Sequence, residues 1–244
     1  MTATDTTKDN LAPVPPAEGL QYLRFLENMH KHLQPEWYLE VGTAQGASLK
    51  LATCKVMAID PRFQIQPDNM GGRPQTHLFE TTSDEFFASG IARQLASTID
   101  LAFLDGMHLF EYLLRDFINT EKLCRPDSVI VLHDLVPPTY IAAERDWDRK
   151  RTKQWTGDVW KVGVILKEYR PDLDLRVANC RPTGLGVITS LNPDDTTLED
   201  NYDEIVARFM DMSLDDYGTE KLSTLFNMQR AMSRHFHDYV GVPA

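Results

Sequence analysis

Four titratable side chains stand at the ends of two apolar runs of the sequence. Asp105 and His108 follow the run TIDLAFL, and His133 and Asp134 follow the run SVIVL. If the two runs are strands of one parallel sheet, their carboxyl ends bring all four side chains to one edge. Two carboxylates and two imidazoles could hold a divalent cation, which lowers the pKa of a bound hydroxyl. A histidine could instead take up the proton as a general base.

The apolar pattern predicts a sheet that would hold these residues. Helical periodicity alternates with the strands and predicts a parallel sheet covered on both faces. Ser83 is the expected cap of the second of these helices, and the segment ASLKLA is expected to be a short helical crossover. The predicted strands are 37–42, 55–60, 76–81, 98–106 and 127–134, and the predicted helices are 20–33, 84–95 and 109–123.

The end of the sheet departs from this alternation. Residues 175–180 and 185–191 are separated only by RPTG, which is too short for a crossover helix, so they predict an antiparallel hairpin. Amphipathic helices are expected after the hairpin, within YDEIVARFMDM and LSTLFNMQRAMSRHF. The predicted fold class is therefore α/β, with a Rossmann-like, doubly wound, mostly parallel seven-stranded sheet, a C-terminal antiparallel hairpin and C-terminal helices.

The stretch YLEVGTAQGASLKLATCKVMAIDP, residues 38–61, has the features of a nucleoside site. Small residues after the first strand leave backbone N–H groups open to a ligand at a positive helix terminus. Asp60, at the end of the second strand, can accept hydrogen bonds from both hydroxyls of a ribose. The structural alternative is a tight turn followed by an acid that caps a helix.

The glycine spacing indicates which nucleoside would bind. Gly42 and Gly46 are four residues apart, unlike the G-x-G-x-x-G of dinucleotide binders, and Glu40 precedes the first glycine by two. A carboxylate there disfavours a pyrophosphate and suits the ammonium group of an amino acid. Together, LEVGTAQGAS, AIDP, IDLAFLDGMH and SVIVLHD resemble the successive motifs of class I S-adenosylmethionine-dependent methyltransferases, and the resemblance covers about residues 20–191.

This resemblance implies a cofactor and its contacts. S-adenosylmethionine would bind with its methionine part against Glu40 and the backbone of 42–46, its ribose at Asp60, and its adenine near the end of the third strand. At that strand end, Thr81 and Thr82 replace the family's usual glycine and acid. The cofactor-binding residues implied in this way are Glu40, Gly42, Thr43, Gly46, Ser48, Asp60, Thr82, Ser83 and Asp105.

The resemblance also bears on the reacting end. DGMH and HD are similar to a bacterial branch of the family related to sugar O-methyltransferases. By position, Asp105, His133 and Asp134 resemble the metal triad of catechol-type O-methyltransferases, which implies Mg²⁺ or another divalent cation. Asp105, His108 and His133 are the expected catalytic residues, and we favour His108 as the base because it can turn toward an acceptor. The structural alternatives are a His133 bonded to the wall and a His108 that only starts a helix.

The segment 137–161 is a long connection after the last parallel strand and is predicted to be a substrate lid. Its Trp155 and Trp160 could wall an aromatic or sugar ring, or pack on the core. Its basic cluster is more typical of a solvated face than of an anion site. The predicted domains are a flexible N-terminal arm (1–17), a methyltransferase domain (18–192) and a C-terminal helical extension (193–244), and a homodimer through the extension is an open possibility.

The composition excludes several partners. The 244 residues include 25 Lys and Arg against 36 Asp and Glu, and the net charge of −11 disfavours nucleic acid and anionic membranes. No segment is long enough to span a bilayer, and the N-terminus lacks a signal peptide. Three scattered cysteines, at 54, 124 and 180, favour reduced thiols in the cytoplasm.

We therefore expect a methyltransferase that uses S-adenosylmethionine to methylate a small-molecule hydroxyl. An NAD-dependent or nucleotide-sugar-dependent Rossmann enzyme is a first alternative, which Glu40 and the glycine spacing disfavour. A non-catalytic nucleoside-binding module is a second alternative. The titratable residues at 105, 133 and 134 argue against that module, because binding alone does not require them.

Overall fold

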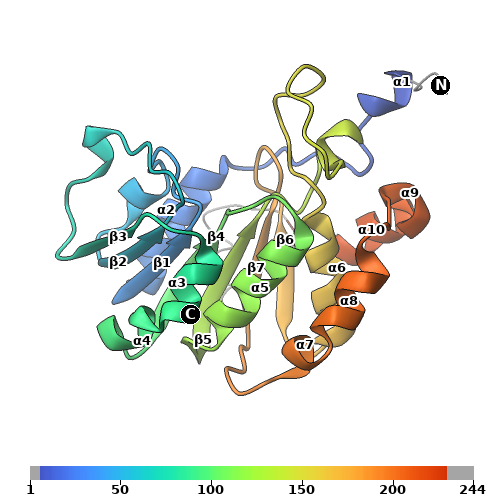
Figure 1. Ribbon diagram of the computed structural model, residues 1–244. Helices are drawn as coiled ribbons and strands as arrows, with labels where there is room; N and C mark the ends of the chain where they lie inside the picture. Colours follow the sequence, from blue (N-terminus) through green and yellow to red (C-terminus); the bar gives the residue numbers. More distant parts are fainter. Residues whose placement is uncertain (1–5, 230–244) are drawn as a thin grey trace.

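The computed structural model describes residues 6–229, whose strands form a seven-stranded sheet of order β3-β2-β1-β4-β5-β7-β6 (Figure 1). β1 to β5 pair in parallel, whereas β7 is antiparallel to both β5 and β6. The predicted fold class, strand number and terminal hairpin are confirmed. The strands are β1 (Trp37–Val41), β2 (Lys55–Ile59), β3 (Thr76–Phe79), β4 (Ile99–Leu104), β5 (Cys124–His133), β6 (Asp174–Ala178) and β7 (Leu185–Thr189).

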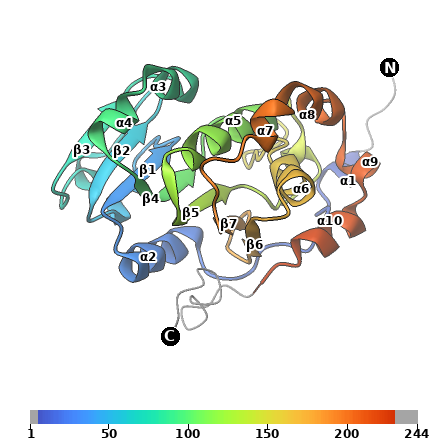
Figure 2. The ribbon, with the colours of Figure 1, turned by 90° about the horizontal axis from the view of Figure 1, so that it is seen from below.

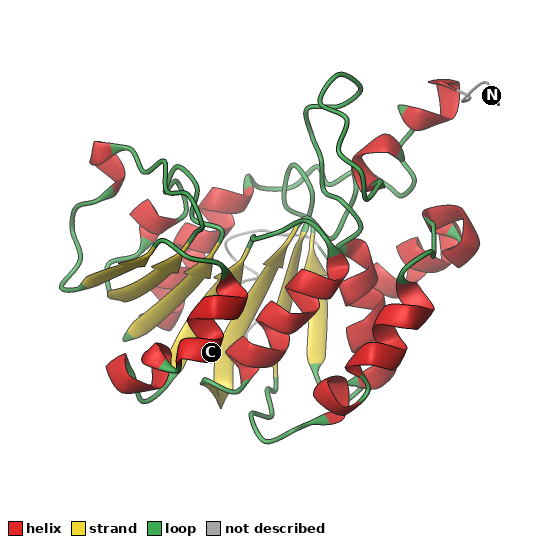
Figure 3. Ribbon diagram, viewed as in Figure 1, coloured by secondary structure: helices red, strands yellow, loops and turns green. Residues whose placement is uncertain are grey.

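Helices cover both faces of this sheet (Figure 2). α2 and η1 pack on one face, and α3, α5, α6 and the C-terminal helices pack on the other. The loops that follow the parallel strands gather at one edge (Figure 3). The helices are α1 (Thr6–Asp9), α2 (Tyr22–Leu33), α3 (Ser83–Ser89), α4 (Ile91–Leu95), α5 (Phe110–Glu121), α6 (Trp160–Tyr169), α7 (Thr197–Asp200), α8 (Tyr202–Phe209), α9 (Leu214–Tyr217) and α10 (Thr219–Phe226), with 3-10 turns η1 (Leu49–Leu51), η2 (Pro67–Asn69) and η3 (Ile141–Ala143).

The register of the central strands places the titratable residues. Leu104 of β4 pairs with Leu132 of β5, so Asp105 and His133 are the next residues of two adjacent strands. Leu104 also pairs with Val41 of β1, which precedes Gly42. All five residues of β1 are buried, as expected for a parallel strand with both faces covered. The glycine turn and the titratable residues therefore meet at the same sheet edge.

Two predicted helices differ in the structure. The crossover ASLKLA contains only the 3-10 turn η1. Gly42, Ala44 and Gly46, which precede it, all adopt positive φ and form a turn in place of the first part of a helix. The helix predicted over 84–95 is two helices, since Gly90 has φ of 67° and interrupts the backbone ladder. Thr82, not Ser83, is the cap of α3, where it forms a capping box with Glu85.

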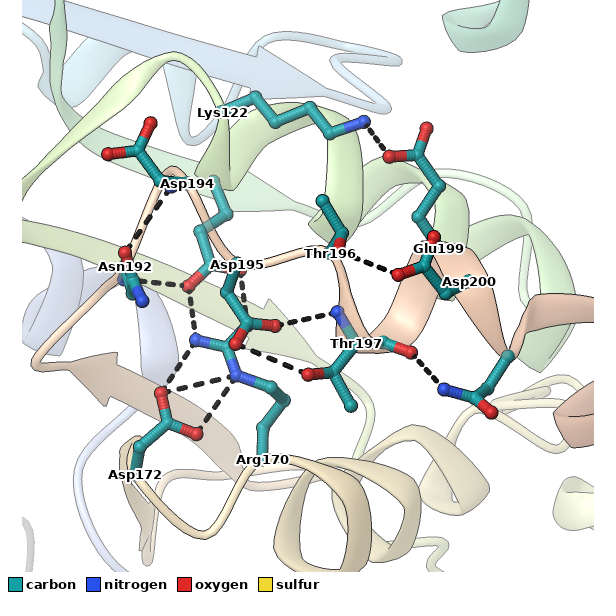
Figure 4. Close-up of polar contacts among 12 residues, drawn as sticks. Lys122, Arg170, Asp172, Asn192, Asp194, Asp195, Thr196, Thr197, Glu199 and Asp200 are labelled. Carbon is teal, nitrogen blue, oxygen red and sulfur yellow. Dashed lines mark hydrogen bonds and ion pairs between the residues drawn. The ribbon is translucent and has the colours of Figure 1, made fainter.

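The C-terminal extension belongs to the same core as the sheet. Ile205 and Phe209 of α8 and Leu222 of α10 are fully buried in the cluster that includes α6. Arg170, which follows α6, holds the chain between β7 and α7 through an ion pair with Asp195, and it also pairs with Asp172 (Figure 4). The predicted boundary at residue 192 therefore divides the sequence without dividing the core. The last part of LSTLFNMQRAMSRHF, with Met232, lies outside the described residues.

The N-terminal segment that was predicted to be a loose arm contacts the body over its described residues. Val14 and Ala17 are buried, and the amide of Tyr140 donates to the carbonyl of Leu11. Asp9 pairs with Arg151 of the predicted lid. The low apolar content of the segment did not predict these contacts, which combine two buried apolar side chains with an ion pair and a backbone hydrogen bond.

Two smaller predictions concern the cysteines and the membrane. Cys124 and Cys180 are buried and Cys54 is partly buried, and all three are free thiols. Among the described residues, no helix combines the length and the hydropathy that a membrane span requires.

Candidate active site

A cavity of about 590 Å³ opens at the carboxyl ends of β1, β2 and β4, within the size range of small-molecule sites. Gly42 has φ of 85°, and a Cβ at this position would lie 1.8 Å from the carbonyl oxygen of Asp105. Only glycine therefore lets the β1 turn pass this close to the loop after β4. The lining includes Gly42, Ala44, Asp60, Pro61, Thr82, Ser83, Asp105, Met107, His108 and Tyr112.

Asp60 lies at the end of β2 and lines this cavity. Its two carboxylate oxygens accept hydrogen bonds from the amides of Ala44 and Arg62, each at 2.7 Å. These bonds fix the side chain across the glycine turn and leave lone pairs on both oxygens. The carboxylate is thus oriented to accept further hydrogen bonds from a diol in the cavity.

The far wall of the cavity is formed by the start of α3. Thr82 and Ser83 line it together with Asp84. The Asp84 carboxylate accepts two hydrogen bonds from Arg115 of α5, at 2.7 and 2.8 Å, which holds the start of α3 against α5. Ser83 also approaches the buried Asp116, whose pKa is raised to about 7 by burial.

Glu40 lies behind the glycine turn and is not among the residues that line the cavity. Its Oε2 accepts a hydrogen bond of 2.6 Å from the hydroxyl of Tyr38. Burial raises the pKa of Glu40 to about 7, although hydrogen bonds from Tyr38, Thr43 and Ser48 lower it. Thr43, Gly46 and Ser48 also do not line the cavity. A ligand would therefore have to extend beyond the cavity wall to contact Glu40 or any of these three residues.

The titratable residues form one cluster beside the cavity. The Nδ1 of His133 lies 3.1 Å from Oδ1 of Asp105 and 3.1 Å from Oδ1 of Asp134. Burial alone would raise the pKa of Asp105, but His133 and His108 lower it to about 2. Although burial lowers the pKa of His133, the two carboxylates raise it well above its usual value.

His108 faces the same carboxylates from the other side. Its Nε2 lies 3.5 Å from Oδ1 of Asp105 and 3.3 Å from Oδ2 of Asp134. One ligand atom from each of Asp105, His108 and Asp134 lies within 4.8 Å of the other two, as in a cation site. The converging set therefore contains His108 where the sequence-based triad had His133. The Nε2 of His133 is buried and has no hydrogen-bond partner.

Asp134 has a backbone conformation that is uncommon outside glycine. Its φ is 61°, in the left-handed region, which aspartate tolerates better than most residues. In this conformation the carboxylate lies between the two histidines, with Oδ1 3.1 Å from His133 and Oδ2 3.3 Å from His108. Strain of this kind is typical of functional positions.

Tyr22, the first residue of α2, completes the cluster and was missed from the sequence. Its ring lies 4.5 Å from the His133 ring, between centroids. Burial and the charges of Asp105, Asp134 and Glu40 raise the pKa of its hydroxyl to about 12. Within an amphipathic helix, the only signal was a tyrosine at a position that otherwise favours an apolar residue.

The predicted lid, residues 137–161, crosses above the strand ends (Figure 1). Its basic residues are partly neutralised, because Arg145 pairs with Glu111 and Asp158, and Arg151 pairs with Glu144. This agrees with the interpretation as a structural face. Trp160 is buried in the core, whereas Trp155 stacks on His108. Of the two tryptophans, only Trp155 therefore reaches the cluster.

Comparisons with known proteins find a family match over the part of the chain that contains this site. Residues 39–135 match the family model described as a methyltransferase domain. No curated protein sequence matches the chain. Among solved structures, similarity is found to the O-methyltransferase TomG from Streptomyces achromogenes, involved in tomaymycin synthesis and in complex with S-adenosylmethionine (15% identity, 70% of this chain and 80% of that chain, TM-score 0.55).

A second similar structure is an O-methyltransferase from Bacillus cereus in complex with S-adenosylhomocysteine. It shares 14% identity over 73% of this chain and 84% of that chain, with a TM-score of 0.53. At these identities the likeness concerns the fold. The matched family model spans β1 to the end of β5, which includes the glycine turn, Asp60 and the titratable cluster. The family match over these residues and the likeness in fold agree with the methyltransferase resemblance that the motifs predicted.

Proposed function

We propose that the protein transfers the methyl group of S-adenosylmethionine to a hydroxyl of a small molecule. The observation that carries the proposal is the position of the cluster: Asp105 and His108 line the same cavity as Asp60 and the glycine turn. A cofactor held at the turn and Asp60 would therefore have its reactive end near groups that can activate a hydroxyl. The S-adenosylmethionine and S-adenosylhomocysteine named for the similar structures support this choice of cofactor.

The reaction needs alignment and the removal of one proton. The acceptor oxygen forms a bond to the methyl carbon while the sulfur–carbon bond breaks, and S-adenosylhomocysteine leaves with the electron pair. Because the cofactor carries its own leaving group, the chain mainly aligns the two reactants and removes the hydroxyl proton. Asp60 and Thr82 would fix the nucleoside, and the cluster of Asp105, His108 and Asp134 would act at the acceptor.

We further propose that Asp105, His108 and Asp134 hold a divalent cation. Two carboxylates and one imidazole that converge within 4.8 Å fit the donor set of such an ion. When bound, the ion would lower the pKa of a coordinated hydroxyl. His133, whose Nδ1 donates to Asp105 and lies 3.1 Å from Oδ1 of Asp134, would orient them. This assignment exchanges the roles of the two histidines relative to the sequence-based hypothesis.

The test of the cofactor site is calorimetry with S-adenosylhomocysteine. Asp60→Ala is expected to weaken binding by roughly 1.5–3 kcal/mol, the range for a hydrogen bond to a charged group. Asp60→Asn keeps one carbonyl oxygen and should lose less. Asp68→Ala, in the exposed turn η2, is the matched control and should bind as the wild type. Wild-type protein that binds NAD but not S-adenosylhomocysteine would contradict the proposal.

Chelation tests the cation separately. Excess chelator is expected to abolish methyl transfer and to leave S-adenosylhomocysteine binding nearly unchanged, because the ion serves the acceptor. Added Mg²⁺ or Mn²⁺ should restore turnover. Full activity in chelator would remove the cation from the proposal and leave His108 as a metal-free base.

The buried Glu40 gives the cofactor affinity an expected pH dependence. An ammonium group near Glu40 favours its carboxylate, so the raised pKa of about 7 means that binding must first remove a proton at lower pH. Affinity for S-adenosylhomocysteine should therefore fall by up to about tenfold per pH unit below 7. Glu40→Gln, measured by the same calorimetry, should flatten this profile. An unchanged profile would place the ammonium group elsewhere.

A small-molecule acceptor follows from the proposed reaction, and the net charge of −11 disfavours a nucleic-acid acceptor. The cytoplasmic location and a homodimer through the C-terminal helices remain predictions. Met210, Met212 and Met228 lie partly buried against the core, which accounts for them without a second copy.

A further inference from the structure

The backbone of the predicted lid contacts the ring of His108 directly. The Nδ1–H of His108 donates a hydrogen bond of 2.7 Å to the carbonyl oxygen of Trp155. A carbonyl can only accept, so this contact requires a hydrogen on Nδ1. The Nε2 atom is then the one that faces Asp105 and Asp134. Residue 155 thus determines which nitrogen of His108 reaches the cluster.

Stacked side chains hold this contact in place. The Trp155 ring stacks on the His108 ring at 5.3 Å between centroids, with 28° between their planes. Trp147 stacks on Trp155 at 5.4 Å and 2°, and Arg149 lies over Trp147 at 4.4 Å. The indole N–H of Trp155 donates to the carbonyl of Glu144 at 2.7 Å. The column therefore connects the exposed part of the lid to the imidazole.

The next residues of the lid contact the backbone around His108. Gly157 has φ of 56°, and a Cβ there would lie 1.7 Å from the carbonyl oxygen of His108. Asp158, which is 2% exposed, accepts a hydrogen bond of 3.0 Å from the amide of Phe110. Its carboxylate is also paired with Arg145 and Lys161. Residues 155–158 therefore contact both the ring of His108 and the backbone from its carbonyl to Phe110.

We propose that residues 155–158 are a positioning element that presents Nε2 of His108 to Asp105 and Asp134 only while the lid lies over the cavity. Displacement of the lid would remove the hydrogen-bond acceptor of Nδ1 and the stacked ring together, so that the imidazole could rotate. Lid closure over an acceptor would thus be coupled to hydroxyl activation. Trp155 and Gly157 act through His108 and are positioning residues. The coupling to hydroxyl activation rests on the proposed function, whereas the orientation of His108 by residues 155–158 does not.

The experiment compares Gly157→Ala with Gly90→Ala. Both glycines have positive φ, 56° and 67°, but a Cβ at Gly90 has no atom within 4 Å, so this control carries the backbone strain without the clash. In protein labelled with ¹⁵N in its histidine rings, the Nδ1–H signal of His108, assigned by its loss in His108→Asn, is expected to be protected from exchange with water. Gly157→Ala should lose that protection and Gly90→Ala should keep it.

Kinetics give the second readout. Gly157→Ala is expected to lower kcat by about 10²-fold, the effect of a displacement near 1 Å in a reacting group, with the KM for S-adenosylmethionine unchanged. If this variant does not fold, Trp155→Leu removes the stacked ring and should reduce the protection in its place. Retained protection in the folded variant, or an unchanged kcat, overturns the proposal. Exchange protection is measured without cofactor. If Gly157→Ala loses this protection but the wild-type protein transfers no methyl group, the result contradicts the proposed function and not the role of residues 155–158.

Discussion

His108→Asn is expected to lower turnover at limiting Mn²⁺ by about 10²-fold, because Lewis-acid stabilisation contributes several kcal/mol. Asparagine places an amide nitrogen where Nδ1 stands, so it can still donate to the carbonyl of Trp155. It removes Nε2, the atom that faces Asp105 and Asp134. Saturating Mn²⁺ should recover part of the activity, which steady-state assays over a metal titration would measure.

His133→Asn is the matched comparison. Its amide nitrogen can likewise replace the Nδ1 that donates to Asp105 and lies beside Asp134. Because Nε2 of His133 is buried and points away from the carboxylates, its loss should affect Mn²⁺ affinity less than the loss of Nε2 of His108. A larger loss of affinity in His133→Asn would restore the triad that the sequence suggested.

The pH dependence of metal binding provides a further check on His108. Burial lowers its pKa, but Asp105 and Asp134 raise it to about 9. A cation must therefore displace a proton from Nε2 below pH 9, so Mn²⁺ affinity should increase by up to about tenfold per unit from pH 7 to 9. In His108→Asn this slope should disappear. If His108→Asn leaves Mn²⁺ affinity unchanged but removes the acidic limb of the pH profile of kcat/KM, then His108 is a base and not a metal ligand.

The sheet and the strand ends could be predicted because they depend on local pattern. Five apolar runs alternate with helical periodicity, and RPTG is too short to allow anything but a hairpin. Once the parallel order is assumed, Asp105 and Asp134 must meet at one edge. The same argument placed Asp60 at the cavity.

The details of the cluster depended on contacts that no local pattern encodes. The approach of Nε2 of His108 to both carboxylates depends on the left-handed backbone of Asp134 and on the lid residue Trp155, 47 residues beyond His108 in the sequence. Tyr22 reaches the cluster because α2 is held by the hairpin, where the amide of Tyr22 donates to the carbonyl of Arg181. The shortened crossover reflects positive φ at three alternate positions, 42, 44 and 46, which small residues permit but do not require.

Arg170→Met is expected to lower the free energy of unfolding by about 3–5 kcal/mol, the cost of leaving a buried charge unpaired. Arg170 is 1% exposed in its side chain and donates to both carboxylate oxygens of Glu121, at 2.7 and 3.0 Å. Glu121 also accepts from the amide of Asn192, and Arg170 lies 3.3 Å from Asp195, so the pair joins α5 and α6 to the start of the C-terminal extension. Urea denaturation would measure the change through a shift in midpoint.

Two comparisons show whether the burial of charge is the cause. Arg208→Met removes an arginine that is 47% exposed and paired with Glu168, so it should cost no more than about 1 kcal/mol. Adding Glu121→Gln to Arg170→Met removes the unpaired charge and keeps an acceptor for Asn192, so the double variant should be more stable than Arg170→Met alone. Equal losses in Arg170→Met and Arg208→Met would mean that the extension is held by its apolar contacts, with Ile205, Phe209 and Leu222 sufficient to keep it on the sheet.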